Sequence, residues 1–298
     1  MKKKGIQKMS KTKKWSKGKI AGVVVVSIAG FLAVLIAVGM LVFNEVYCKT
    51  KQYTVISISE VTDRDATLVA HRGFSAVAPE NTAPAFIEAG LAGFGGTECD
   101  VYRTKDGVWV VQHDKHTYRM MDKSSFIENI TYEKLQTYTT DNGSNIANYA
   151  DLKICTLDEY LDICKQYDMV PVIELKGPNN TEHYDEIIAS VENFGLSDKV
   201  VYISFHIENL KAMRALSDAP LYYLASVIDD EAINDALALG GKCGIDFDGR
   251  KEENTQEIIK ECQDKGLLMG AWTIDKAEDL NRLLDWGVTL ITTNAIKP

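Results

Sequence analysis

Residues 156–175 read TLDEYLDICKQYDMVPVIEL, and this stretch predicts a helix that leads into a strand. Four side chains recur at the spacing of one helix face: Leu157, Tyr160, Leu161 and Cys164. Thr156 precedes that face and Glu159 follows three residues later, which is the pattern of a capping box at a helix start. The short apolar run from Met169 to Leu175 has the length of a buried strand.

The same alternation of helix and strand extends over most of the chain. Eight short apolar runs predict strands: residues 67–70, 97–102, 169–175, 199–204, 219–225, 244–247, 267–272 and 289–293. Helical spacing recurs between them, for example at Ile258, Ile259 and Cys262 and at Leu280, Leu283, Leu284 and Gly287. Repeats of this kind favour parallel strands joined by right-handed crossovers.

Length and repeat number together indicate the fold class. About 235 residues with eight strand–helix units suit an α/β fold of the (β/α)8 TIM barrel type, which typically has about 250 residues. A doubly wound open sheet is the alternative, although no GxGxxG motif for a dinucleotide follows a strand. A further strand over 108–112 follows the hairpin signal Asp106-Gly107. The irregular, polar residues 115–154 predict an insertion after the second strand, over one end of the barrel.

The N-terminal part differs in composition from the rest. Residues 1–19 hold nine Lys and no acid, whereas residues 20–43 are uncharged and long enough to cross a hydrocarbon core of about 30 Å as a helix. Because Lys-rich flanks stay in the cytoplasm, we expect a single-pass protein of the cell membrane with a cytoplasmic N-terminus and an extracellular barrel domain. The predicted order is a basic cytoplasmic tail (1–19), a transmembrane helix (20–43), a linker (44–64) and the barrel domain (65–298). A cleaved signal peptide is the alternative, but its apolar region usually has only about 7–15 residues.

The remaining chain is acidic, with 24 basic residues against 42 acidic ones. This balance argues against nucleic acid as a partner, because phosphate contacts need clustered Lys and Arg. None of the six cysteines forms a CxxC or another metal-binding spacing: Cys48, Cys99, Cys155, Cys164, Cys243 and Cys262. We therefore expect buried free thiols and no disulfide framework.

Ionisable residues gather where four predicted strands end. The pairs are His71 with Arg72, Glu98 with Asp100, His113 with Asp114, and Glu174 with Lys176. Residues two apart on a strand point to the same face, and the strand ends of a barrel meet at the face where active sites lie. A single such pair is more often solvated or salt-bridged. Four pairs on nearby strands indicate a functional site.

Three of these side chains are carboxylates expected to point into the barrel: Glu98, Asp100 and Glu174. Buried unpaired carboxylates are costly, and three together repel one another unless a cation lies between them. Oxygen ligands favour a hard ion, so the sequence predicts Mg²⁺ or Ca²⁺ rather than Zn²⁺.

Two histidines beside such a cation suit the chemistry of a phosphate ester. His71 and His113 would supply a general base and a general acid, and Arg72 and Lys176 would stabilise charge on phosphoryl oxygens. The other histidines are expected at the surface: His116, His183 and His206.

These residues are part of a longer series of motifs. In chain order they are HRG at 71–73, PENT at 79–82, ECDV at 98–101, TKDG at 104–107, HD at 113–114 and ELK at 174–176. The series resembles the glycerophosphodiester phosphodiesterase family. The similarity continues more weakly through Ser204-Phe205 and Trp272-Thr273-Ile274.

The resemblance implies a TIM barrel that hydrolyses glycerophosphodiesters to an alcohol and sn-glycerol 3-phosphate with a divalent cation. It implies His71 and His113 as the catalytic pair and three metal ligands: Glu98, Asp100 and Glu174. The implied substrate-binding residues are Arg72, Lys176, Glu80, Phe205 and Trp272. Glu80 is also expected to order the first loop or to support the metal site.

Two positions depart from the family's usual pattern. Asn294 stands where the family often has Asp, and Asp275 stands where Asn is common. We expect neither residue to touch the catalytic set, so both bear on substrate detail and not on activity.

Two other functions remain open at this point. One is a different His-pair barrel phosphodiesterase, similar to a phospholipase C or a sphingomyelinase D, and the other is a non-catalytic envelope-binding module. The expected partners are a glycerophosphodiester, or an ester derived from a lipid or wall polymer, and the membrane. The head group, the metal, the oligomeric state, cleavage of the apolar helix and the division of acid and base between the histidines stay open.

Overall fold

The computed structural model describes residues 17–43, 51, 53–57, 66–178 and 180–298. The chain divides into two compact units, Met1–Lys49 and Thr50–Pro298. The first contains helix α1 (Lys17–Phe43), which covers the apolar segment. Within the described ranges, no helix combines the length and apolarity needed to cross a membrane, so the anchor stays a prediction. Most of the predicted basic tail and of the linker lies outside the described residues.

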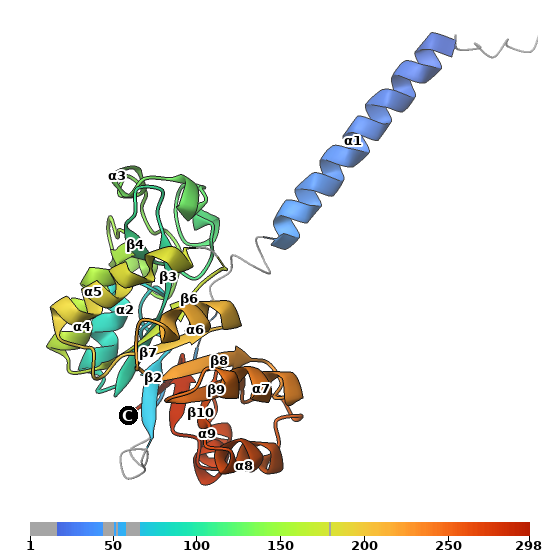
Figure 1. Cartoon of the computed structure of the whole chain (residues 1–298). Coiled ribbons are helices and arrows are strands. Elements are labelled where there is room, and N and C mark those ends of the chain that lie inside the picture. The colour runs from blue at the N-terminus through green and yellow to red at the C-terminus, as the bar shows by residue number, and fades with distance from the viewer. Residues whose placement is uncertain (1–16, 44–50, 52, 58–65, 179) are drawn as a thin grey trace, which may run out of the picture. The chain divides into compact units, whose positions relative to one another are not determined.

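Eight parallel strands close into a barrel in the second unit (Figure 1). They are β2 (Thr67–Ala70), β3 (Gly96–Arg103), β6 (Val170–Leu175), β7 (Val201–Ser204), β8 (Leu221–Ala225), β9 (Cys243–Asp248), β10 (Leu268–Trp272) and β11 (Leu290–Thr293). The pairs β11–β2 and β2–β3 complete the ring. The predicted strands and the predicted barrel are therefore confirmed, because an open sheet would leave two unpaired edges.

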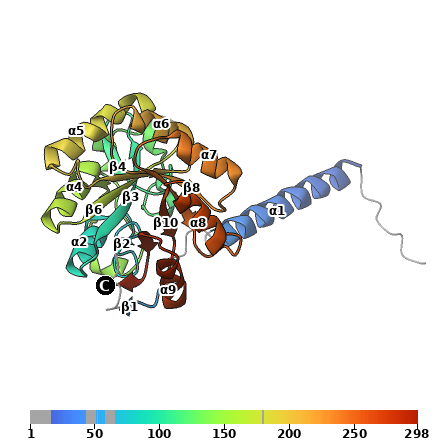
Figure 2. The ribbon, with the colours of Figure 1, turned by 60° about the horizontal axis from the view of Figure 1, so that its bottom comes forward.

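Helices surround these strands (Figure 2). They are α2 (Ala83–Leu91), α4 (Leu157–Gln166), α5 (Tyr184–Phe194), α6 (Ile207–Arg214), α7 (Asp230–Ala238), α8 (Gln256–Asp264) and α9 (Ala277–Asp285), with the 3-10 turn η6 (Thr181–His183) before α5. The predicted capping box is present: the backbone N–H of Glu159 donates to Thr156 Oγ1 at 3.1 Å, and that of Thr156 donates to Glu159 Oε2 at 2.7 Å. Gly287 lies beyond α9 at φ +78°, a left-handed conformation that ends the predicted stripe early.

A short strand that was not predicted follows the last barrel strand. After β11 the chain forms β12 (Ile296–Lys297), which pairs in parallel with β1 (Ile56–Ser57). Residues 56–57 of the predicted linker therefore pair with the C-terminal end of the barrel unit.

The alternation of the strands separates two apolar layers. Side chains directed into the barrel form a small cluster of Val69, Val172, Val201, Ile203, Tyr222, Leu224 and Leu290. The opposite faces pack against the helices, for example Cys99 and Val101 of β3. Five cysteines are buried and free: Cys99, Cys155, Cys164, Cys243 and Cys262. Glu98 and Asp100 alternate with Cys99 and Val101, so they face the barrel interior.

The insertion after β3 is built on a hairpin. Strand β4 (Trp109–Val111) runs antiparallel to β3, and the unpredicted strand β5 (Cys155–Thr156) runs antiparallel to β4. Between them lie η3 (Thr117–Arg119), η4 (Ile127–Asn129), α3 (Tyr132–Leu135) and η5 (Ile146–Asn148) around their own apolar cluster. Ser144 Oγ donates to the Ser75 carbonyl at 2.6 Å. The insertion thus holds the loop that follows β2.

Candidate active site

The residues singled out at the strand ends lie around one cavity of about 190 Å³. Its lining consists of His71, Arg72, Glu98, His113, Glu174, Ile203, Phe205, Leu224, Asp246, Trp272, Thr273 and Thr292. Apart from His113, which follows β4 of the insertion, they come from the barrel strands or the loops after them, at the face where barrel active sites are found. The structure therefore brings together both predicted catalytic histidines and two of the three predicted metal ligands in this lining.

The third carboxylate completes a compact group. One oxygen each of Glu98, Asp100 and Glu174 lies within 4.8 Å of the others, and all three residues are buried. Two of these carboxylates each accept a hydrogen bond from the protein through one oxygen. Glu98 Oε2 accepts from the backbone N–H of Arg72 at 2.8 Å, and Asp100 Oδ2 accepts from Asn81 Nδ2 at 2.7 Å. Glu98 Oε1 is buried without a hydrogen bond, and Asp100 Oδ1 also lacks one but lies 3.3 Å from Lys176 Nζ.

The charges of this group also fit a cation. Burial, together with Asp100 and Glu174, raises the pKa of Glu98 well above its usual range. Burial and Asp100 raise the pKa of Glu174 to about 7, although Lys176 opposes the shift. Asp100 is buried as well, but nearby cationic side chains, Lys176 foremost, hold its pKa well below the ordinary value. Carboxylates that resist ionising beside one another form a set that a hard divalent cation stabilises.

The two predicted phosphate-binding side chains contact this carboxylate group. Lys176 Nζ lies 2.8 Å from Glu174 Oε1 and 3.3 Å from Asp100 Oδ1. Arg72 Nε lies 3.5 Å from Asp100 Oδ2, and its side chain lines the cavity. Arg72 also donates from Nη1 to Glu80 Oε1 at 2.8 Å. Both cations therefore offset negative charge in the resting site.

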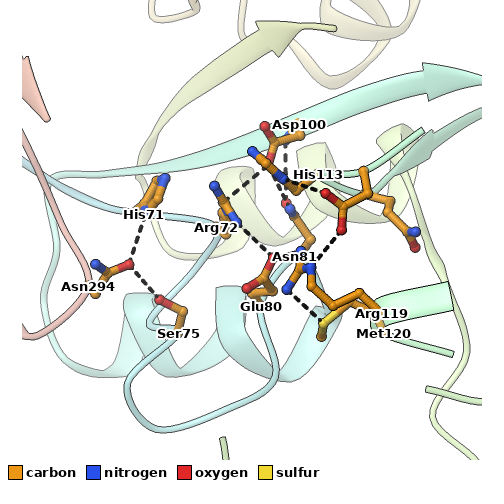
Figure 3. Close-up of polar contacts among 12 residues, drawn as sticks. His71, Arg72, Ser75, Glu80, Asn81, Asp100, His113, Arg119, Met120 and Asn294 are labelled. Atoms are coloured by element: carbon orange, nitrogen blue, oxygen red, sulfur yellow. Dashed lines mark hydrogen bonds and ion pairs between the residues drawn. The ribbon is translucent and has the colours of Figure 1, made fainter. Parts of the chain in front are cut away.

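A chain of polar contacts leads from His113 back to the loop after β2 (Figure 3). His113 Nδ1 lies 3.0 Å from Asp114 Oδ1, and Asp114 Oδ2 accepts from Arg119 Nε at 2.6 Å. Arg119 Nη2 in turn donates to Glu80 Oε1 at 2.6 Å. Burial opposes ionisation of Glu80, but Arg72 and Arg119 hold its pKa below the usual range. Glu80 thus orders the first loop by joining it to Arg119 of the insertion.

His71 is held in a different way (Figure 3). Its Nδ1 lies 2.8 Å from Asn294 Oδ1, which also accepts from Ser75 Oγ at 3.1 Å. Asn294 Nδ2 donates to Asp275 Oδ2 at 2.8 Å. Burial and the neighbouring Arg72 lower the pKa of His71 to about 4, so the ring is neutral near pH 7. The expectation that neither residue touches the catalytic set is wrong for Asn294, because closure of the barrel brings the end of β11 against His71, whereas Asp275 reaches His71 only through Asn294.

The opposite wall of the cavity is largely apolar. The rings of Phe205 and Trp272, both predicted to bind substrate, meet edge to face with centroids 5.5 Å apart, and Phe205 is 42% exposed. Ile203 and Leu224 complete this wall. Asp246 is its one carboxylate, and both its oxygens are buried without a hydrogen-bond partner. Burial, with a smaller effect of Glu174, raises the pKa of Asp246 well above its usual range.

The remaining histidines do not line this cavity. His116 caps η3 by accepting from the backbone N–H of Tyr118 at 3.2 Å, and its Nε2 lies 3.1 Å from Ser124 Oγ. His206 is exposed before α6, and His183 is half-buried beside Glu186. The predicted surface placement is met by His206, whereas His116 and His183 are only partly exposed.

Sequence reasoning missed several polar residues of the site: Asn81, Asp114, Arg119, Asp246, Asp275 and Asn294. A signal existed for Asp246, because its alternation with Ile245 and Phe247 at the end of a strand directs a carboxylate into the barrel. Asn81 lay within a motif already noted, and Asp114 was noted beside His113. The contacts of Arg119 and Asn294 depend on segments that meet only in the folded chain.

Comparison with known proteins agrees with this geometry. The model of the glycerophosphoryl diester phosphodiesterase family matches residues 71–297. The glycerophosphodiester phosphodiesterase of Bacillus subtilis is 29% identical over 246 residues, which cover 76% of this chain and 82% of the relative. That of Caldanaerobacter subterraneus subsp. tengcongensis is 28% identical over 236 residues, which cover 76% and 93%.

A solved structure shows the same fold. The phosphodiesterase of Oleispira antarctica, in complex with the product sn-glycerol 3-phosphate, superposes with a TM-score of 0.71 at 24% identity, over 77% of this chain and 93% of that one. The family match covers seven of the eight barrel strands together with both histidines and all three carboxylates. The chain therefore belongs to the glycerophosphoryl diester phosphodiesterase family and is a glycerophosphodiester phosphodiesterase.

Proposed function

We propose that this enzyme is metal-dependent and membrane-anchored, and that it releases sn-glycerol 3-phosphate and an alcohol from its substrate. The observation that carries the proposal is a single cavity with two imidazoles, His71 and His113, beside the buried carboxylate group. The two curated relatives named as glycerophosphodiester phosphodiesterases support the reaction class. The product bound in the Oleispira antarctica enzyme supports the identity of the phosphate product.

We assign the cation to the carboxylate group of Glu98, Asp100 and Glu174, because three buried carboxylates with oxygens within 4.8 Å of one another suit Mg²⁺ or Ca²⁺. Such an ion, when bound, stabilises negative charge on the phosphoryl oxygens. Arg72 adds a permanent positive charge to the same lining and orients the phosphate against the two histidines.

The two histidines divide the proton transfers. One takes the proton of the attacking oxygen while that oxygen bonds to phosphorus, and the other gives a proton to the alcohol oxygen while its bond to phosphorus breaks. The attacking oxygen belongs either to water or to the neighbouring 2-hydroxyl of the glycerol. In the second case a cyclic phosphate forms and a water molecule opens it. Both routes consume one water and end at the alcohol and glycerol 3-phosphate.

The test of this activity uses the full-length chain in detergent with glycerophosphocholine as substrate. We expect release of glycerol 3-phosphate that stops with EDTA and returns with Mg²⁺ or Ca²⁺. His71→Ala and His113→Ala should each lower kcat by about 10²–10⁴-fold. The double variant should lose much less than the product of both losses, because the pair acts as a unit.

His116→Ala is the matched control, because His116 lies three residues from His113 but caps η3 away from the cavity. It should keep turnover close to that of the parent enzyme. Equal damage from His116→Ala and His113→Ala would contradict the assignment. Choline phosphate in place of glycerol 3-phosphate would show the cleavage of a phospholipase C-like enzyme.

The membrane part of the proposal rests on the sequence. Residues 20–43 are uncharged and follow nine Lys, and helix α1 covers this segment. Under the positive-inside rule the N-terminus is cytoplasmic and the barrel is extracellular. Free glycerophosphodiesters and esters derived from lipids or wall polymers are then within reach of the enzyme.

Protease added to intact cells tests this orientation. The barrel should be digested while a cytoplasmic marker protein stays intact. Full protection of the barrel, in cells whose wall admits the protease, would contradict the extracellular location.

A further inference from the structure

We infer that Asp275 and Asn294 are positioning residues that fix the proton of His71 on Nδ1, so that Nε2 presents a free lone pair to the cavity. The inference rests on the proposed function, because it concerns one member of the proposed histidine pair. It also assigns the roles of the pair, with His71 as the base and His113 as the acid.

The orientation of the Asn294 amide is the first step. An amide side chain can present either its oxygen or its nitrogen to a neighbour, so another group must decide between them. Asp275 decides here, because its Oδ2 accepts from Asn294 Nδ2 at 2.8 Å. Its Oδ1 accepts from the backbone N–H of Asn294 at 2.7 Å and from Thr293 Oγ1 at 3.1 Å. Three donors converge on this carboxylate, which holds it in place and leaves it accepting in each contact.

The tautomer of His71 follows from this orientation. With Nδ2 turned to Asp275, the Asn294 oxygen faces His71 Nδ1 at 2.8 Å and accepts from Ser75 Oγ at 3.1 Å. A carbonyl oxygen can only accept, so Nδ1 must carry the hydrogen. A neutral imidazole has one N–H, which leaves Nε2 unprotonated. Burial and Arg72 lower the pKa of His71 to about 4, which agrees with a neutral ring.

The second histidine has a partner of the opposite kind. Behind His113 Nδ1 lies the carboxylate of Asp114 at 3.0 Å, and Arg119 Nε holds that carboxylate at 2.6 Å. A carboxylate stabilises a positively charged ring, whereas an amide oxygen supplies no charge. His71 therefore takes the proton of the attacking oxygen on Nε2, and His113 gives its proton to the departing alcohol oxygen.

Asp275→Asn tests the inference because it changes one oxygen into a nitrogen. The amide oxygen introduced at position 275 can still accept from Thr293 Oγ1 and from the backbone N–H of Asn294, but the amide nitrogen then faces Asn294 Nδ2. Two donors cannot pair, so Asn294 turns and offers Nδ2 to His71. His71 must then accept at Nδ1 and carry its proton on Nε2, the wrong nitrogen for a base.

The reciprocal exchange restores every contact. In the double variant Asp275→Asn with Asn294→Asp, Nδ2 at position 275 donates to a carboxylate oxygen at position 294. The other oxygen at 294 still accepts from His71 Nδ1 and Ser75 Oγ. Asn294→Asp alone instead places two carboxylates in contact. Activity should therefore be lost in both single variants and recovered in the double variant. Because the carboxylate at position 294 then raises the pKa of His71, the recovery is measured at a pH where the ring is neutral.

The kinetic measurement is turnover of glycerophosphocholine by the full-length chain in detergent with Mg²⁺. We expect Asp275→Asn to lower kcat by about 10²-fold with little change in KM, because the loss falls on proton transfer and not on binding. The double exchange should return kcat to within about tenfold of the parent value. Asp264→Asn is the matched control, since Asp264 ends α8 on the side of the barrel away from the cavity and pairs with exposed Lys260.

A spectroscopic measurement shows whether Asp275 controls the tautomer of His71 or only supports the local structure. The chain has five histidines, so long-range ¹H–¹⁵N spectra of histidine-labelled protein can be assigned by comparison with His71→Ala. His71 should show a protonated Nδ1 in the parent and in the double exchange, and a protonated Nε2 in Asp275→Asn. An ester with a good leaving group, such as the 4-nitrophenyl ester of glycerol 3-phosphate, should restore turnover to His113→Ala but not to Asp275→Asn.

The outcomes separate this inference from the proposed function. Full turnover in His71→Ala would overturn the proposed histidine pair itself. Loss of turnover in His71→Ala together with an unchanged His71 tautomer or an unchanged kcat in Asp275→Asn would overturn only the positioning role. Failure of the double exchange to recover turnover would also overturn it, because the damage would then be structural.

Discussion

The two halves of the barrel mouth differ in the polarity of the side chains that line them. On the side of β2, β3, β4 and β6, each charged side chain named above contacts a group of opposite charge or a hydrogen-bond partner. On the side of β7 to β10, the lining is mainly Ile203, Phe205, Leu224 and Trp272, and Asp246 stands among them without a partner. The charged half can hold an anion and transfer protons. The apolar half can only make shape-dependent contacts with the group attached to that anion.

This difference indicates in which half of the mouth a substitution should lower turnover most. In the charged half a single substitution leaves a buried partner uncompensated, and the loss spreads along the chain of contacts. In the apolar half a substitution removes contact area and little else. We therefore expect effects on turnover to fall steeply from one half to the other.

The largest effect should come from the carboxylate group. Glu98→Gln, Asp100→Asn and Glu174→Gln each replace a charged oxygen ligand by a neutral amide of the same size. Each should weaken binding of Mg²⁺ or Ca²⁺ and lower kcat by about 10³-fold or more, because several kcal/mol of charge stabilisation are lost. Isothermal titration with the metal and turnover of glycerophosphocholine measure the two effects separately.

A high metal concentration provides the control for these variants. If the loss arises from affinity, turnover should recover in part as the metal is raised. Variants that keep both metal binding and turnover, in an enzyme that EDTA does not inhibit, would show that the carboxylates are structural.

The strands of this fold could be predicted because they are apolar along most of their length. Strands that are buried beneath helices need such a composition. β2 forms at the predicted residues 67–70, and the other seven barrel strands differ from prediction only at their ends. The carboxylate group could be predicted too, because Glu98 and Asp100 share a strand face and β6 is placed with Glu174 opposite Asp100. The two-residue strands β1 and β12 have no such pattern, because so few residues carry no periodicity.

The fine structure of the site could not be predicted in the same way. Asn294 is 223 residues from His71, and their contact exists only because β11 pairs with β2. Arg119 reaches Glu80 across 39 residues through an insertion of irregular structure. Polar contacts of this kind depend on positions within a few tenths of an ångström, which residue type and spacing do not fix.

The second effect concerns the link between the insertion and the first loop. Arg119→Met removes the partner of both Glu80 and Asp114 while keeping most of the side-chain volume. Since Arg119 is partly exposed, we expect a loss of about 1–3 kcal/mol in the free energy of unfolding. We also expect kcat to fall by about 10–100-fold, because His113 loses its fixed carboxylate.

The pH dependence of this loss has a definite sign. Against the opposing effect of burial, Arg72 and Arg119 hold the pKa of Glu80 below its ordinary value of 4.5, and contacts with His113 and Arg119 hold that of Asp114 below 3.8. The stabilisation is therefore complete above these values. It fades below them because the carboxyls protonate first in the unfolded chain, and it is lost once the pH falls through their lowered pKa values in the folded protein. Denaturant unfolding should show a large difference between parent and variant at pH 7 and a smaller one near pH 3. A difference that grows toward low pH would contradict this chain of polar contacts.

The third effect lies in the apolar half. Phe205→Ala removes a half-exposed ring that packs edge to face on Trp272. We expect KM to rise by up to about tenfold for esters with bulky apolar alcohols, since a buried ring contributes about 1.5 kcal/mol or more. For glycerophosphocholine the change should be smaller, and kcat should stay near the parent value. If Phe205→Ala lowered kcat as much as His113→Ala does, the charged and apolar halves would not differ in their roles.

The smallest effect on turnover should come from Asp246→Asn. This variant also tests most directly whether the charged and apolar halves differ in function. Asp246 is buried with both oxygens unpartnered, and burial keeps its pKa far above the usual range. The neutral amide has nearly the same size and no charge to desolvate, so the free energy of unfolding at pH 7.5 should rise by about 1–3 kcal/mol. KM and kcat for glycerophosphocholine should change by no more than about threefold, because the charged half does the chemistry. A loss of 10²-fold or more with the fold intact would show that Asp246 binds the substrate directly, and the apolar half would then take part in recognition through a polar contact.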